Sequence, residues 1–185
     1  MQKLICSLII MTSLTITGQV EQTYQLNTEK SVLNWKGTYA FLFSEHSGTV
    51  SFKEGQLHAE NGNLMGGSFT IDMNSITNED YKLNQGPVEH LKDTDFFDVP
   101  NYSEAKLVIT KVTYFAEENQ HKIEGLLTIK GIAQPIEFWA TVDAANKVMI
   151  TRFKIDRKRW GITYNNKLKN HAISDAIEFE AELFF

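Results

Sequence analysis

Over most of the chain, apolar and polar residues alternate one by one, and this period of two restricts the fold more than any other feature. In one early segment, Leu33, Trp35 and Tyr39 fall on one parity, whereas Asn34 and Lys36 fall on the other. Successive side chains of a β-strand point to opposite faces, so this pattern predicts strands with one buried face. The same alternation returns in several later segments, the last of which is 176–185.

Turn signals separate these segments. Asn61–Gly62 predicts a tight hairpin. Glu54–Gly55 is interpreted as a second turn, followed by a short return strand. Pro87 fits the first turn of a short helix, with Gln85–Gly86 as its entry, and this is the only convincing helix after the N-terminal segment. Many short strands with almost no helix are typical of a sandwich or barrel, and no linker divides them, so we expect one all-β domain.

The N-terminus has the layout of a secretory signal peptide. Lys3 is followed by an apolar run, Leu4–Ile16, and then by small and polar residues. The run is too short to span a bilayer comfortably, and the alternative is a buried N-terminal strand or helix. We expect cleavage near Gly18, residues 19–185 as one domain, and a periplasmic or secreted protein. Cys6, the only cysteine, would then be removed.

Composition restricts the partners. Of the 185 residues 42% are hydrophobic, enough for a sizeable core, and twelve are Phe. The net charge is −5 and the basic residues are interleaved with acidic ones, whereas nucleic-acid binders usually carry a basic patch. We therefore expect no nucleic-acid partner and no stable membrane insertion. Edge strands that pair between two chains would give a homodimer, which the sequence neither requires nor excludes.

Four stretches, in this order, resemble a known family. They are Ser31–Trp35 (Ser-Val-Leu-Asn-Trp), His90–Val99 (His-Leu-Lys-Asp-Thr-Asp-Phe-Phe-Asp-Val), Gly125–Pro135 and Asp156–Ile162. The chain is similar over about residues 22–184 to the YceI-like polyisoprenoid-binding proteins of bacteria. It departs from the family pattern in two places. At Asp93–Thr94 the family often has Ser. Shortly after the Phe-Phe-Asp block the family often has a Tyr-Pro pair, whereas here Pro100 comes before Tyr102.

The resemblance implies an extended antiparallel, eight-stranded barrel of lipocalin type with one short helix. It also implies that the interior holds a long apolar amphiphile, a polyisoprenoid or quinone-type lipid, which the protein carries or sequesters. The sequence has no G-x-S-x-G, H-E-x-x-H or phosphate-loop pattern, so we expect no enzyme. No cofactor is expected apart from such a lipid.

Alternation and the matched stretches select the residues expected to face this ligand. They are Trp35, Tyr39, Phe41, Phe52, Phe69, Met73, Phe97, Leu107, Ile129, Phe138, Phe153, Arg157 and Trp160. Gly37, Gly48 and Ala140 share the inward faces and are expected to leave gaps between the aromatic rings. Concave, mostly apolar sites of this kind suit a lipid tail. Alternation alone favours the alternative, in which the same side chains fill a solid core.

Arg157 is the polar residue singled out, because it shares parity with Phe153 and Ile155. A guanidinium can bind a phosphate or carbonyl head group with a forked pair of hydrogen bonds. The alternative is a structural ion pair with a carboxylate such as Asp95 or Asp98, since an unpaired buried charge is costly.

Two other readings remain open. His90 with Asp93, Asp95 or Asp98 suggests a metal site, or a hydrolase acting on a lipid or small ester. The spacing matches no strong metal or catalytic motif, so we expect no metal and no catalytic residues, and instead Phe96 and Phe97 as a plug at one barrel end. The remaining alternative is a solid barrel that serves as an interaction module.

Overall fold

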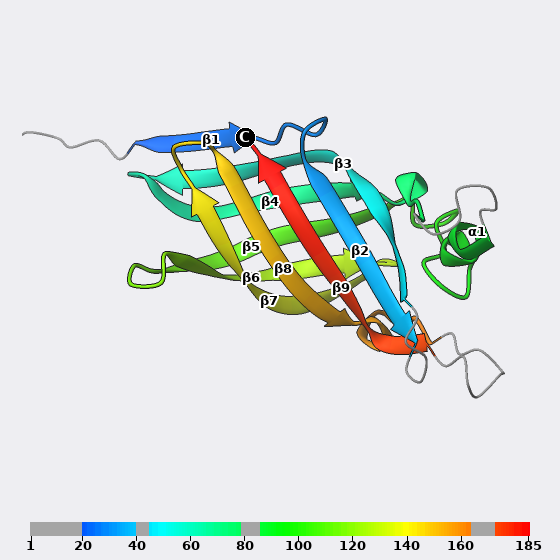
Figure 1. Ribbon diagram of the computed structural model, residues 1–185. Coiled ribbons are helices and arrows are strands. Elements are labelled where there is room, and N and C mark those ends of the chain that lie inside the picture. The colour runs from blue at the N-terminus through cyan, green and yellow to red at the C-terminus, as the bar shows by residue number, and fades with distance from the viewer. Residues whose placement is uncertain (1–19, 40–44, 79–85, 164–172) are drawn as a thin grey trace, which may run out of the picture.

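The computed structural model describes residues 20–39, 45–78, 86–163 and 173–185, and Figure 1 shows their arrangement. The strands are β1 (Glu21–Gln25), β2 (Val32–Tyr39), β3 (Glu45–Glu60), β4 (Asn63–Asp72), β5 (Glu104–Phe115), β6 (Gln120–Ile129), β7 (Ile132–Asp143), β8 (Val148–Asp156) and β9 (Ile173–Phe184). The helices are the short α1 (Gly86–Lys92) and two 3₁₀ turns, η1 (Met73–Ser75) and η2 (Arg157–Trp160). None of the helices in the described residues is long and apolar enough to cross a membrane.

The strands form one antiparallel sheet that closes on itself. Its order is β1-β3-β2-β9-β8-β7-β6-β5-β4, and β4 pairs back onto β3. Eight strands therefore make a closed barrel, and β1 lies outside the circuit, paired with the second half of β3. The expected eight-stranded, antiparallel, all-β barrel is confirmed, and the described residues contain one short α-helix, α1.

Turn chemistry explains the hairpins. The β3–β4 turn places Asn61 at φ 50° and Gly62 at φ 82°, the left-handed region that Asn and Gly tolerate best. Asn119 takes φ 51° between β5 and β6 for the same reason.

The turn expected at Glu54–Gly55 is wrong. Both residues lie inside β3, where the register with β4 shifts between Phe52 and Glu54. A Cβ on Gly55 would lie 2.5 Å from the Phe69 ring and 2.9 Å from the Leu26 side chain. Gly55 is therefore needed for close packing at an irregularity within β3. Glycine is common both at such irregularities and in turns, so the sequence alone does not distinguish the two.

One neighbouring pair of strands is joined over only part of its length. β8 pairs with β9 from Val148 to Asp156, along all of β8. β8 pairs with β7 only from Val148↔Asp143 to Thr151↔Ala140. The described residues 132–139 of β7 and 152–156 of β8 have no ladder partner in each other, so the wall is incomplete there.

Candidate functional site

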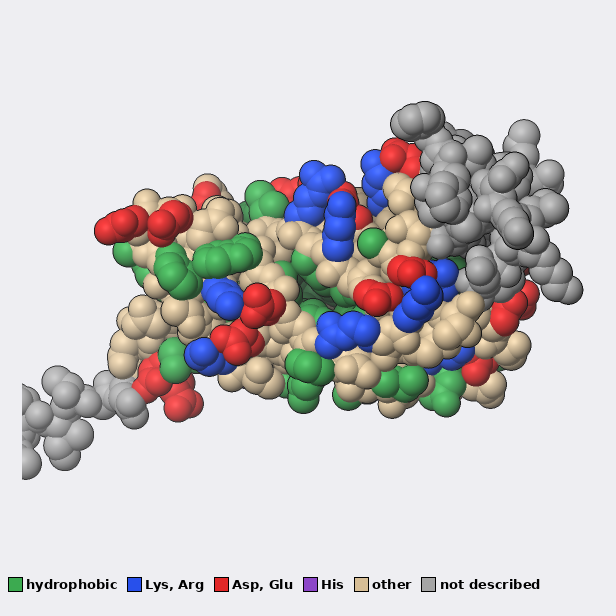
Figure 2. Space-filling view, turned by 90° about the horizontal axis from the view of Figure 1, so that it is seen from below, with side chains coloured by type: hydrophobic (Ala, Val, Ile, Leu, Met, Phe, Trp, Pro, Cys, Tyr) green, Lys and Arg blue, Asp and Glu red, His purple; other side chains and the backbone are tan. Residues whose placement is uncertain are grey.

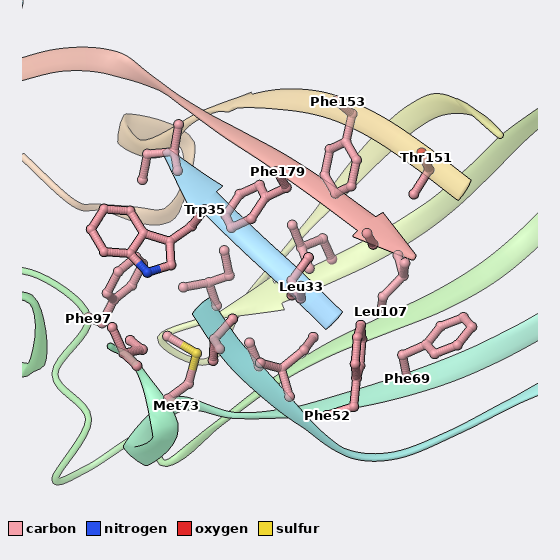
Figure 3. Close-up of a pocket in the computed structure, with 18 of the residues that line it drawn as sticks. Leu33, Trp35, Phe52, Phe69, Met73, Phe97, Leu107, Thr151, Phe153 and Phe179 are labelled. Carbon is pink, nitrogen blue, oxygen red and sulfur yellow. The ribbon is translucent and has the colours of Figure 1, made fainter. Parts of the chain in front are cut away.

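An apolar cavity of about 120 Å³ lies inside the barrel (Figure 3). Most of the residues expected to face a ligand line it: Trp35, Phe52, Phe69, Met73, Phe97, Leu107, Ile129, Phe138 and Phe153. The interior is therefore hollow as well as aromatic, which alternation alone did not predict. None of the lining side chains in the described residues is titratable.

Trp35 is fixed at one side of the cavity by its indole nitrogen. The Nε1–H of Trp35 donates to the main-chain oxygen of Thr77, at 3.1 Å. This bond satisfies the polar edge of the ring, so that its apolar surface faces the cavity (Figure 3).

Three phenylalanines from neighbouring strands form a row on the wall of the cavity. Phe138 of β7 stacks on Phe153 of β8 with ring centroids 4.8 Å apart and an interplanar angle of 22°. Phe153 in turn contacts Phe179 of β9 at 5.5 Å. The Phe138–Phe153 stack joins β7 to β8 where their ladder is missing.

Thr151 is the lining residue with a polar side chain. Its Oγ1–H donates to the main-chain oxygen of Trp139 at 2.7 Å, so the hydroxyl is already satisfied. The cavity consequently offers dispersion and hydrophobic contact, and very little hydrogen bonding, to whatever occupies it.

The end of the barrel beside α1 is closed by apolar side chains. Phe96 and Phe97 are buried, pack edge to face at 4.8 Å, and line the cavity together with Leu91 of α1. The plug expected from the Phe-Phe-Asp block therefore lies where the sequence placed it.

Two of the expected ligand-facing residues do not line the cavity. Trp160 is fully buried in η2, and its Nε1–H donates to the main-chain oxygen of Leu127 at 2.9 Å. Arg157 also belongs to η2, because β8 ends at Asp156 and the parity shared with Phe153 ends with it. Two further members cannot be placed: Phe41 and the side chain of Tyr39 lie outside the described residues.

Arg157 is a structural residue. It is 2% exposed, and its Nη1 donates to the oxygen of Ile162 at 2.6 Å while its Nε donates to the oxygen of Ser174 at 3.2 Å. Its ion-pair partner is Asp175, at 3.4 Å, so the structural pair with a carboxylate is present, but with Asp175 in place of Asp95 or Asp98. The guanidinium holds the start of β9 against η2.

The three small residues expected to leave gaps differ from one another. A Cβ on Gly37 would meet nothing within 4 Å, and Gly37 lines the cavity, so this gap is real. A Cβ on Gly48 would lie 2.0 Å from the main-chain oxygen of Thr77, so this glycine admits a close backbone approach instead. Ala140 is buried but does not line the cavity.

His90, Asp93 and Asp95 gather outside the cavity, with potential ligand atoms within 4.8 Å of one another. His90 Nδ1 lies 3.8 Å from Asp95 Oδ1, and both aspartates are exposed. None of the three lines the cavity, so a hydrolase that uses His90 on a substrate inside the barrel gains no support.

Several lining residues were missed. Phe179 and Leu183 of β9 line the cavity, and the alternation of that strand already places them on one face. Thr151 was missed although it shares the parity of Phe153 and Ile155, because its side chain carries a hydroxyl.

Residues 24–185 match the family described as the YceI-like domain. The chain belongs to the YceI-like family. The barrel is thus a YceI-like barrel, a binding-protein fold, and the resemblance of the four sequence stretches is confirmed. The comparison with curated proteins gave no match.

Solved structures share this fold at low sequence identity. BcnA of Burkholderia cenocepacia is 19% identical with a TM-score of 0.68, over 85% of this chain and 98% of that chain. A Campylobacter jejuni YceI protein is 19% identical with a TM-score of 0.51, over 79% of this chain and 82% of that one. Both structures share the fold of this protein, and this similarity establishes the closed barrel.

Proposed function

We propose that the protein binds a long apolar amphiphile, of the polyisoprenoid or quinone type, inside the barrel and carries or sequesters it without catalysis. The observation that supports this proposal most is the cavity itself, whose described lining is apolar apart from the Thr151 hydroxyl and the Trp35 indole N–H, both of which donate to main-chain oxygens. A tail that enters it gains about 0.8 kcal/mol for each CH₂ group removed from water. The expected export to the periplasm or medium belongs to the same proposal.

The cavity must widen to take such a tail. Its volume is about 120 Å³, below the roughly 300–1,000 Å³ of typical small-molecule sites. An apolar cavity of about 150 Å³ holds one benzene ring. A longer tail therefore requires lining side chains to rotate, and Met73, with three rotatable bonds, is suited to such movement.

Lipid extraction tests the proposal directly. Protein purified from its native source without detergent is extracted with organic solvent, and the extract is analysed by mass spectrometry. We expect a stoichiometric isoprenoid or quinone-type lipid. Repeated absence of lipid, together with no binding of added isoprenoids, would contradict the proposal.

A pair of tryptophan variants tests the place of binding. Leu107 lines the cavity, whereas its neighbour Val108 is exposed on the outer face. Leu107→Trp should fill the cavity and weaken isoprenoid binding at least tenfold, while Val108→Trp should leave binding unchanged. Fluorescence titration with a lipid probe gives both affinities, and equal affinities would exclude the barrel interior as the site.

A further inference from the structure

We propose that the amphiphile enters the barrel sideways, through a window between β7 and β8, and that its uncharged polar end remains in this window. The inference rests on the proposed function and adds to it a route and a site for the head group. The window is the part of the wall between residues 136–138 of β7 and 152–156 of β8, where the two strands share no ladder pair.

Side chains mark both ends of the window. At one end the ladder stops at Ala140↔Thr151, and the Thr151 hydroxyl donates to the oxygen of Trp139 at 2.7 Å. At the other end η2 approaches β7: Arg159 Nη2 donates to the oxygen of Pro135 at 2.6 Å. Between these two bonds the wall is not closed by main-chain pairing.

Main-chain donors and acceptors face this window. The oxygens of Pro135 and Trp139 both accept bonds from the side of β8 and η2, and the direction of main-chain groups alternates along a strand. The N–H and C=O of Glu137, midway between them, therefore point the same way. If the ladder continued, they would pair with Lys154, whereas here they have no strand partner.

The sequence of β7 fits a strand with one free edge. Proline has no N–H and is confined to edge positions of sheets, and Pro135 lies inside β7 with the same parity as Glu137. Over residues 132–139, β7 thus has a full ladder with β6 on one side and a free edge on the other.

Aromatic side chains close the window on the inside. Phe138 and Phe153 stack at 4.8 Å across it, and both line the cavity. Phe153 and Phe179 are half-buried, unlike most of the cavity lining. Figure 2 shows hydrophobic side chains at the bottom of a hollow on this face, surrounded by basic and acidic ones. Rotation of one ring about its side-chain bonds would join the cavity to this hollow.

The charges around the hollow favour an uncharged head group. An outer groove that runs over β5, β6 and β7 to the edge of the window is lined by Lys154 and Arg159 together with Glu124 and Glu137, so the two signs balance. Lys154 already pairs with Glu178 at 3.1 Å, and Glu137 with Lys122 at 3.0 Å. The apolar cavity would penalise a buried polar group. A hydroxyl or carbonyl head group that bonds to the main chain of Glu137 carries no net charge and stays outside the apolar cavity.

A proline substitution tests the head-group site. Glu137→Pro removes the N–H in the window, while Glu137→Ala keeps it, and both lose the ion pair with Lys122. Farnesol and farnesene, an alcohol and a hydrocarbon of equal carbon number, then compete with a fluorescent probe. We expect Glu137→Pro to bind farnesol about fivefold more weakly than Glu137→Ala, the usual effect of one hydrogen bond, and farnesene equally well. Equal farnesol affinities in folded variants would overturn the head-group site.

Uptake kinetics test the route, whether or not Glu137→Pro folds. Phe153→Ala opens the window, and Phe97→Ala opens the plug at the α1 end. We expect faster association and dissociation of the probe, at least fivefold, only in Phe153→Ala. Glu137→Cys and Lys154→Cys, combined in a Cys6→Ser background and joined by a short bis-maleimide, should slow uptake at least tenfold. Faster exchange in Phe97→Ala alone, or unchanged uptake after cross-linking, would overturn the window.

The two levels of proposal fail differently. If the unaltered protein binds neither farnesol nor farnesene, the lipid-binding function itself is wrong. If it binds both while the window variants behave like the unaltered protein, the function stands and only the window is wrong.

Discussion

β8 has two neighbours, and the walls it forms with them are built differently. With β9 it shares a continuous ladder from Val148 to Asp156. With β7 the ladder covers only residues up to Thr151, and the remaining contact is made by a phenylalanine stack, a threonine hydroxyl and the side chains of η2. We call these the β8–β9 seam and the β7–β8 seam.

The difference shows two ways to close a barrel. A hydrogen-bonded ladder is cooperative along the strand, and opening it exposes a row of unpaired peptide groups. A seam closed by side chains opens when one ring rotates, at no cost in main-chain bonds. We therefore expect the β8–β9 seam to provide stability and the β7–β8 seam to allow ligand exchange, and the substitutions below test this expectation.

The largest effect is expected where η2 closes the β7–β8 seam. Trp160→Ala should lower the free energy of unfolding by about 3–5 kcal/mol, because a fully buried ring and its bond to the Leu127 oxygen are lost. Trp139, which is 46% exposed on β7, is the matched control, and its alanine variant should lose less than about 1 kcal/mol. Chemical denaturation measures both, and similar losses would show that η2 is not structural.

The next effect concerns the buried guanidinium. Arg157→Met should cost about 2–3 kcal/mol, because the oxygens of Ile162 and Ser174 lose a charged donor. Lipid affinity should not change, since Arg157 does not line the cavity. The exposed Arg152→Met serves as the control for stability. A loss of lipid binding in folded Arg157→Met would restore the head-group role expected from the sequence.

A smaller effect is expected at the end of the β7–β8 ladder. Thr151→Val preserves shape but removes the bond to the Trp139 oxygen, which should cost about 1–2 kcal/mol. Thr110→Val removes an exposed hydroxyl bond to the Glu124 oxygen and should cost much less. Thr151→Val should also speed lipid exchange, as measured by stopped-flow fluorescence. Equal stability of the two variants would mean that the hydroxyl does not secure the seam.

The smallest effect is expected on the β8–β9 seam. Hydrogen bonding to Arg152, aided by Lys154, holds the pKa of Glu178 below its usual value. A lowered carboxyl pKa stabilises the folded state above the usual value of about 4.3, and this contribution is lost as the pH falls through the lowered pKa. Glu178→Gln should therefore reduce the difference in stability between pH 7 and pH 3, by under about 1 kcal/mol. Glu180→Gln is the control, and an unchanged pH dependence in Glu178→Gln would contradict the assignment.

Alternation predicted the strands and most of the cavity wall, because every second side chain of a strand points to the same, buried face. It placed Trp35, Phe52 and Phe138 correctly. It was wrong at Arg157, because parity holds only within a strand and β8 ends one residue earlier. It was also wrong about Gly48, because whether a missing Cβ leaves a space or admits another backbone depends on Thr77, distant in sequence.

The incomplete seam left a single trace in the sequence, Pro135, which is compatible with an edge but does not say which neighbour is missing. The internal cavity left no trace in the sequence, since a filled and an empty barrel require the same pattern of apolar residues. Both properties arise from the relative placement of strands, which is a tertiary effect.

The place of β9 in the barrel has a consequence for biosynthesis. β9 is the last strand, yet it pairs with β2 near the start, and the N–H of Phe184 donates to the hydroxyl of Ser31, 153 residues earlier. Chains emerge from the ribosome N-terminus first, so β2 and β8 each keep an open edge until β9 has emerged. Such distant pairing also slows folding. The newly made chain is therefore most vulnerable to aggregation and proteolysis until β9 has been made, and loss of Ile173–Phe184 would leave the barrel open between β2 and β8.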